Sequence, residues 1–134
     1  MYFYNKEVEL SALEGLVIKS ISGVTKDSEE VKITTECGKE FVFYHDQDCC
    51  ESVTVYDFDY DFDLSGALIL SSEEVCSEER PEDVNISYED ESETWTFYKI
   101  ETNKGGLWMR WHGSSNGYYS ESVSLAWTNK PENF

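Results

Sequence analysis

The fold class is decided by the segment Val31–His45, which reads VKITTECGKEFVFYH. Its first half alternates apolar and polar side chains, with Val31 and Ile33 set against Lys32. This period of two residues is typical of a half-buried strand. A short turn containing glycine follows, and Glu40–His45 resumes an extended pattern rich in aromatic and β-branched residues. The segment therefore predicts two antiparallel strands joined by a tight turn.

Similar patterns continue on both sides of this segment. Strands are expected at 16–23, 31–36, 40–45, 52–56, 94–101, 107–112 and 118–127, with Asn116-Gly117 as a hairpin turn before the last. Serines and acidic residues at Ser71–Glu79 predict a short helix. The acidic stretch at about 77–93 is expected to be a mobile loop. The prediction is a mainly β fold, with α+β as the alternative: a single domain over 1–134, built as a curled antiparallel sheet of two meanders with one or two short helices.

The net charge of −18 is concentrated in one part of the chain. Residues 46–98 contain seventeen acidic residues and one arginine, so this window carries −16 of the total. Such a field repels nucleic acid and anionic membranes and attracts basic protein surfaces. It also destabilises the compact state by self-repulsion, unless cations or a partner offset it.

Compartment is predicted from what the chain lacks. No run of apolar residues is long enough to span a membrane, and the first residues, MYFYNKEVEL, do not resemble a signal peptide. We therefore expect a cytoplasmic protein whose four cysteines remain thiols.

The segment Asp57-Phe-Asp-Tyr-Asp-Phe-Asp63 alternates acids with apolar residues, so an extended strand would place Asp57, Asp59, Asp61 and Asp63 on one face. Carboxylates on one face of a strand repeat about every 6.6 Å, which is of the same order as the phosphate spacing along a DNA strand. These residues are therefore candidates for binding a basic partner. From Asp61 onward the run also begins like a calcium-binding EF-hand loop, but Ser72 occupies the twelfth position, where glutamate is required. Loosely held calcium remains an alternative.

The segment His45-Asp-Gln-Asp-Cys-Cys-Glu51 collects several groups that can bind zinc: His45, Asp48, Cys49 and Cys50. Zinc sites usually pair ligands that are separated by two to four residues, whereas Cys49 and Cys50 are adjacent. Neighbouring side chains on a strand point to opposite faces, so both thiols reach one ion only if the backbone turns there. The alternative is structural: one cysteine packs in the core, and the acids remain in water.

The strand predicted at 107–112 has two different faces. One carries Leu107, Met109 and Trp111 and is expected to face the core. The other carries Trp108, Arg110 and His112, a composition that is frequent at the centre of protein interfaces. This second face is either a partner-binding surface or a second core layer.

No catalytic residues are predicted. Gly113-Ser114-Ser115-Asn116-Gly117 matches the nucleophile motif G-x-S-x-G in letters only, because that motif needs a strand–turn–helix on a large parallel sheet. Phosphate-binding glycine loops and H-E-x-x-H are absent from the sequence.

Several long segments resemble a known family. They are HDQDCCESV at 45–53, LSGALI at 64–69, WTFY at 95–98 and WHGSSNGYYSESV at 111–123. Together they resemble a family of small uncharacterised proteins encoded by bacteriophages and prophages, over about 15–123. The resemblance implies a phage origin and a site of action in the bacterial cytoplasm, and it brings no activity with it. The acidic runs at 57–63 and 77–93 depart from that family's pattern.

These observations predict a protein that is not an enzyme and that binds a basic host protein. A nucleic-acid enzyme is the partner class considered first, with the protein acting as a counter-defence inhibitor or a DNA mimic. Direct binding to nucleic acid or membrane is not expected. Two alternatives remain open: a metal-binding protein or small metalloenzyme centred on His45–Glu51, with zinc or calcium, and a structural or assembly accessory protein.

Overall fold

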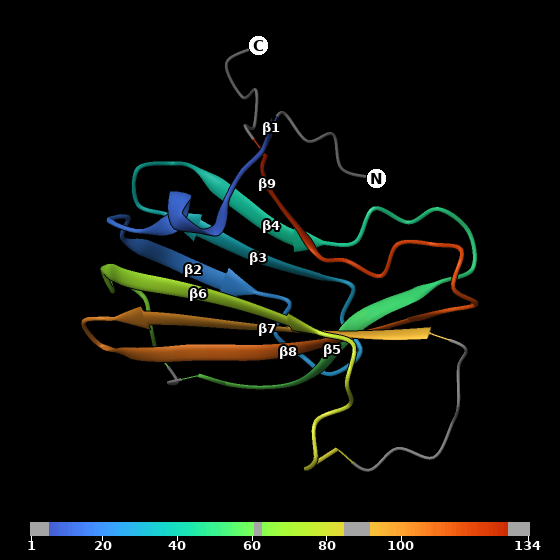
Figure 1. Ribbon diagram of the computed structural model, residues 1–134. Coiled ribbons are helices and arrows are strands. Elements are labelled where there is room, and N and C mark those ends of the chain that lie inside the picture. The colour runs from blue at the N-terminus through green and yellow to red at the C-terminus, as the bar shows by residue number, and fades with distance from the viewer. Residues whose placement is uncertain (1–5, 61–62, 85–91, 129–134) are drawn as a thin grey trace.

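A computed structural model describes residues 6–60, 63–84 and 92–128, and it shows two stacked antiparallel sheets (Figure 1). The five-stranded sheet has the order β1 (Lys6–Glu7), β9 (Ser124–Trp127), β4 (Glu40–Tyr44), β3 (Glu30–Thr35) and β2 (Ile18–Ser22). The four-stranded sheet has the order β5 (Ser52–Tyr60), β8 (Gly105–Ser115), β7 (Ser92–Thr102) and β6 (Ile69–Ser77). A 3-10 turn, η1 (Leu10–Leu13), lies between β1 and β2. The mainly β prediction is confirmed.

The hairpin predicted at Val31–His45 is β3 paired with β4. Val31 lies opposite Phe43 and Ile33 lies opposite Phe41, so the apolar residues of both strands meet on one face. All four of these side chains are buried, whereas Lys32 is only partly so. In β3 the alternating pattern of the sequence is therefore the alternation between the core and the outside of this sheet, whereas in β4 the intervening Val42 is buried as well.

The core lies between the two sheets. The five-stranded sheet contributes Val31 and Phe43, and β8 of the other sheet contributes Met109 and Trp111, all of which are fully buried. The inward face of the 107–112 strand was predicted correctly. Burying a large apolar side chain of this kind stabilises a domain by about 1.5–3 kcal/mol, so these residues dominate the cohesion of the two layers.

The helix predicted at Ser71–Glu79 is wrong, because this segment forms most of β6. It pairs without interruption with β7, from Ser71 opposite Glu101 to Ser77 opposite Trp95. Helix-capping serines and early acids are weak local signals, and pairing with a neighbouring strand overrides them. Because β6 is at the end of its sheet, most of its side chains stay exposed, and so it lacked the buried alternation that identifies a strand.

The strand predicted at Tyr118–Trp127 is correct only at its end. β8 continues to Ser115, and a loop stabilised by the Asn116 side chain follows, whose Oδ1 accepts the N–H of Tyr118 at 3.0 Å. The chain then enters the other sheet as β9, which pairs with β4 and β1. Asn116-Gly117 is therefore not the turn of a β8–β9 hairpin. The strand predicted at 52–56, which follows the three strands of the first meander, is part of β5 and pairs with β8 in the other sheet.

The two sheets are joined along one side by main-chain hydrogen bonds between the segments at 15–18 and 66–69. Gly15 donates to the carbonyl of Ile69 at 2.9 Å, and Ile18 donates to the carbonyl of Ala67 at 2.8 Å. On the other side, Asp27 donates to the carbonyl of Val55 at 2.7 Å. These contacts give the curled arrangement that the sequence predicted. Within the described ranges, no helix has the length and apolar character needed to cross a membrane.

Candidate functional site

Two loops cross from one sheet to the other at the same end of the molecule. The first joins β4 to β5 through His45–Glu51, and the second joins β8 to β9 through 116–123. His45 connects them, because its Nδ1 lies 2.7 Å from the carbonyl oxygen of Ser122. The two motifs that are most distinctive in the sequence are therefore neighbours in space.

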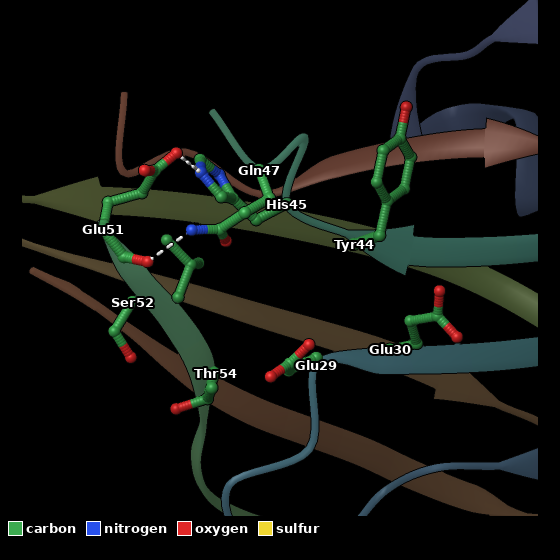
Figure 2. Close-up of a pocket in the computed structure, with 9 residues that line it drawn as sticks. Glu29, Glu30, Tyr44, His45, Gln47, Glu51, Ser52 and Thr54 are labelled. Carbon is green, nitrogen blue, oxygen red and sulfur yellow. Dashed lines mark hydrogen bonds and ion pairs between the residues drawn. The ribbon is translucent and has the colours of Figure 1, made fainter. Parts of the chain in front are cut away.

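Glu51 holds the first crossover together. Its side chain is fully buried, and its carboxylate lies 2.7 Å from Nε2 of His45. It also accepts the backbone N–H groups of Asp48 at 2.8 Å and Cys49 at 2.9 Å. Gln47 completes the loop by donating its amide to the Glu51 carbonyl at 2.7 Å (Figure 2). A buried carboxylate with several donors fixes the loop backbone around itself.

These contacts determine the pKa of Glu51. Burial alone raises the pKa of Glu51, but the hydrogen bonds from His45 and from the Cys49 and Asp48 backbone outweigh it and lower the pKa to about 2. Both ring nitrogens of His45 face oxygen acceptors, so both contacts are hydrogen bonds at once only when both nitrogens carry protons. His45 and Glu51 therefore form a buried hydrogen-bonded pair, which is an ion pair whenever the imidazole is protonated.

A second buried acid, Glu121, supports the other crossover, and the sequence had not singled it out. Its carboxylate accepts the hydroxyl of Thr94 at 2.8 Å and the hydroxyl of Ser115 at 2.5 Å, and the residue is only 7% exposed. The chain packs tightly here: a Cβ placed on Gly113 would lie 2.7 Å from the carbonyl oxygen of Glu121. Glycine is therefore required at this position of β8 for steric reasons.

A pocket of about 310 Å³ opens beside the first crossover, between β3 and β5 (Figure 2). Glu29, Glu30 and Thr54 form one part of its wall, and Figure 2 shows the Glu51 carboxylate turned toward His45. His45 and Glu51, which also line this pocket, bind each other and the loop backbone.

The structure does not assemble the predicted zinc ligands. His45 uses both ring nitrogens within the crossover, and Asp48 is exposed with its backbone N–H bound to Glu51. Cys49 and Cys50 are joined in a disulfide, and both are exposed. The expectation of free thiols therefore holds for Cys37 and Cys76 but not for this pair, and neither of the two adjacent cysteines is buried in the core. Among the described residues, no three His, Cys, Asp or Glu side chains are placed to hold a metal ion.

The predicted row of aspartates is broken up. β5 ends at Tyr60, so Asp63 is not on this strand, and its Oδ1 instead accepts the backbone N–H of Ser65 at 3.0 Å. Asp57 is bound by Arg110, and Asp59 is exposed on β5. Asp61 lies outside the described residues. The three described carboxylates, those of Asp57, Asp59 and Asp63, therefore do not form the regular ladder that an extended strand would give.

Arg110 occupies the centre of the outer face of the four-stranded sheet, between two aspartates. Its guanidinium binds Asp57 through Nε at 2.8 Å and Nη2 at 2.5 Å, and it binds Asp83 through Nη1 at 2.9 Å and Nη2 at 3.1 Å. These contacts raise the pKa of Arg110, and the hydrogen bond from Arg110 lowers the pKa of Asp83. The segment after β6 is thereby tied onto the sheet.

This tie covers one half of the outer face, including His112. Val84 is buried, and Arg80 binds Glu93 at 3.0 Å. His112 is only 8% exposed, lies 3.0 Å from Glu93, and packs against the ring of Trp95 at 4.5 Å. At this half, the expected second core layer is what the structure shows. The loop expected at about 77–93 is also shorter, because β6 includes Ser77 and β7 begins at Ser92, and residues 85–91 lie outside the described part.

The other half of the outer face is open. Phe97 and Trp108 lie side by side with ring centroids 6.0 Å apart, and Val75 on β6 is 49% exposed. Exposed carboxylates of Asp59 and Glu73 lie on the same face as these apolar groups. We call this set the open face: Asp59, Glu73, Val75, Phe97, Lys99 and Trp108. Sequence analysis found Trp108 and Asp59 but missed Phe97, although the alternation of Phe97 with Tyr98 on the predicted strand was visible.

Comparison with known proteins assigns the chain to a family, but the description of that family names no activity. Residues 14–125 match the family described as Domain of unknown function (DUF7448), and the chain belongs to this family. The match includes both crossovers and the whole open face. No curated protein and no solved structure matches the chain.

Proposed function

We propose that this DUF7448 protein is a non-enzymatic binding protein, and that its open face binds a basic partner protein. The observation that carries the proposal is the pair of partly exposed aromatic rings, Phe97 and Trp108, lying beside exposed carboxylates. Interfaces are commonly built from such a group of large apolar side chains surrounded by polar ones.

Charge supports a basic partner. Asp59 and Glu73 are exposed on the open face, and Glu78, Glu79 and Glu82 follow directly after β6. The carboxylates that bind cations within the chain, such as Asp57 and Glu93, are a different set. The exposed set accelerates encounter with a positively charged surface and disfavours acidic partners.

A small hollow at the end of the open face suits a basic side chain. It has a volume of about 270 Å³ and is lined by Asp59, Glu101 and Trp108, together with Lys99. A lysine or arginine inserted there would meet carboxylates and the indole ring, a combination that attracts cations. Lys99 already lies 3.3 Å from Glu101, so a basic group of the partner would compete with it for this carboxylate.

The finer part of the proposal concerns the partner's identity. The family resemblance seen in the sequence suggests a phage protein in a bacterial host, and the charge suggests a host protein that normally binds nucleic acid. The protein would then occupy a basic DNA-binding or RNA-binding groove. The broken aspartate row favours an irregular acidic surface with an aromatic centre over a regular copy of phosphate spacing.

Capture from bacterial lysate tests the proposal. The bait is the full chain, with and without excess duplex DNA, and bound proteins are identified by mass spectrometry. We expect a basic protein that DNA displaces, and we expect Asp59→Lys with Glu73→Lys to abolish its capture. The matched control is Glu29→Lys with Glu36→Lys, which makes the same charge change at exposed positions beside β3.

The outcomes separate the parts of the proposal. Loss of capture in the open-face variant alone supports the open face as the binding surface. Equal loss in both variants shows that net charge is sufficient and contradicts a discrete site. If DNA does not displace the captured protein, the result still supports a binding protein but contradicts nucleic-acid mimicry. If no specific protein is retained at about 0.1 M salt, where the Debye length is about 10 Å, the proposal fails.

A further inference from the structure

The outer edge of β6 is a place where the sheet can be extended. We propose that an extended, basic segment of the partner pairs with this edge through main-chain hydrogen bonds and becomes an additional strand of the four-stranded sheet. This inference rests on the proposed function and specifies how the partner is held. It is the binding mode known as strand addition, in which main-chain hydrogen bonds supply affinity and side chains supply specificity.

Among the described residues, only the first part of this edge has hydrogen-bond partners for its main-chain groups. Ile69 donates its backbone N–H to the carbonyl of Leu16 at 2.9 Å, and Ser72 donates its own to Oε2 of Glu14 at 3.0 Å. β6 is the last strand in the order of its sheet, and beyond Ser72 no strand within the described ranges pairs with its outer edge. The open portion therefore runs from Glu73 to Ser77.

The contact of the Ser72 N–H shows which backbone groups of β6 face the open edge. Its N–H points to Glu14 and away from β7, and the register between β6 and β7 is unbroken from Ser71 to Ser77. In an antiparallel strand the N–H and C=O groups of alternate residues point to the same side. Glu74 and Cys76 therefore point their backbone groups to the open edge, while those of Glu73 and Val75 pair with β7.

The charge along this edge selects the occupant. Glu73, Glu74, Glu78 and Glu79 are all exposed on or just after the open portion. A second copy of the chain would bring the same carboxylates against them, and like charges on adjacent strands are destabilising. Acidic side chains on an edge strand thus block self-association. A segment carrying lysine or arginine would turn the same contacts into attractive cross-strand pairs.

The edge also continues the open face. The side chains of Glu73 and Val75 lie on the face of the sheet that carries Phe97 and Trp108, because Val75 is opposite Phe97 and Phe97 is opposite Arg110 in the strand register. An added strand would place its alternate side chains beside Val75. One partner segment can therefore use both the main-chain edge and the aromatic surface.

The test uses the full chain and a synthetic peptide in which lysine alternates with valine. A second peptide of the same sequence carries methyl groups on alternate backbone nitrogens, so it keeps the charge but cannot pair. Cys76→Pro removes an N–H that faces outward, which an edge strand tolerates, and Cys76→Ala is the matched control that retains the N–H. Binding is followed by calorimetry, and the exchange of individual backbone amides is followed by NMR.

We expect the unmethylated peptide to bind the natural chain and Cys76→Ala equally, and Cys76→Pro roughly tenfold more weakly. The amides of Glu74 and Cys76 should become protected, while those of Glu73 and Val75, already paired with β7, should change little. On the natural chain, we expect the methylated peptide to bind more weakly than the unmethylated one. This comparison tests the same main-chain pairing, so the test stands even if the proline variant does not fold.

Equal binding of both peptides, with no loss in Cys76→Pro, would show that charge alone holds the peptide. That result overturns pairing at the edge and leaves the proposed function standing. Absence of binding by either peptide also overturns it, whereas lysate capture with the charge variants judges the proposed function separately. A dimer of the chain that Cys76→Pro dissociates would identify a second copy as the occupant and contradict the proposal.

Discussion

The crossover around Glu51 and the open face with β6 use the same residue type in opposite ways. At the crossover, Glu51 and Glu121 are buried and accept hydrogen bonds from His45, hydroxyls and backbone N–H groups. On the open face, Asp59 and Glu73 are exposed. An acidic residue in this chain is therefore structural where donors surround it, and it is available to a partner where they do not.

The largest expected effect comes from neutralising the buried crossover acid. Glu51→Gln removes the buried carboxylate that binds His45 and two backbone N–H groups, and removal of one member of a buried pair is strongly destabilising. We expect Tm to fall on the order of 10 °C, measured by thermal unfolding. Asp59→Asn is the matched control on an exposed acid. Equal Tm changes in the two variants would contradict a structural role for the crossover.

The same pair predicts a pH dependence. The folded-state pKa of Glu51 is about 2, below its ordinary value of 4.5, so the stability it contributes is fully present above pH 4.5. That contribution is lost as the pH falls from 4.5 toward 2. In urea unfolding across this window, the difference in stability between the natural chain and Glu51→Gln should shrink as the pH falls. A difference that is constant with pH would show that the carboxylate charge is not responsible.

The close contact between the second crossover and β8 gives the next effect. Gly113→Ala should lower the free energy of unfolding by about 1–3 kcal/mol, because the added Cβ meets the backbone and Cβ of Glu121. Gly106→Ala is the control on the same strand, since its nearest atom is the tip of the Glu101 side chain, which can move. Urea unfolding of the two variants measures the difference. A smaller loss in Gly113→Ala than in Gly106→Ala would contradict this packing.

Arg110 lies between the two regions and should give a smaller change. Arg110→Met removes the contacts to Asp57 and Asp83, but both carboxylates are substantially exposed, so we expect a loss of only about 1 kcal/mol in urea unfolding. Lys99→Met, which removes an ion pair between two exposed groups, should change stability by less than about 0.5 kcal/mol. An Arg110→Met loss as large as that of Glu51→Gln would place Arg110 among the buried structural pairs.

The open-face acids should affect stability least. Asp59→Asn with Glu73→Gln should leave the free energy of unfolding within about 0.5 kcal/mol of the natural value, while weakening binding to the captured basic partner. Urea unfolding and calorimetry on the same preparations measure both quantities. A destabilised variant with unchanged binding would assign these residues to the fold and would remove the difference between the two regions.

The sequence predicted the β class because Val31, Ile33, Phe41 and Phe43 alternate with a period that local geometry determines. It failed at β6 and at Tyr118–Val123, where long-range pairing determines the structure. β6 is an edge strand with little burial, and the chain after Ser115 leaves its sheet for the other one. Both the pairing of β6 and the move of the chain into the other sheet depend on strands that are distant in the sequence.

The site was predicted in part. Trp108 and Asp59 were identified from alternation and charge, whereas Val75 was hidden by a wrongly predicted helix. The local letters of His45–Glu51 suggested a metal site, because they do not reveal that Glu51 folds back onto His45 and the Asp48 backbone. Asp57 was assigned to a partner, but its bond to Arg110 joins residues that are far apart in the sequence.

The most direct test of the difference between the two regions is hydrogen exchange of the full chain, alone and bound to the captured basic partner. We predict slower exchange in the complex over β6 and the open-face segments of β5, β7 and β8, with no change in His45–Glu51. Protection confined to the His45–Glu51 crossover, with β6 and the open face unaffected, would contradict the proposed binding surface.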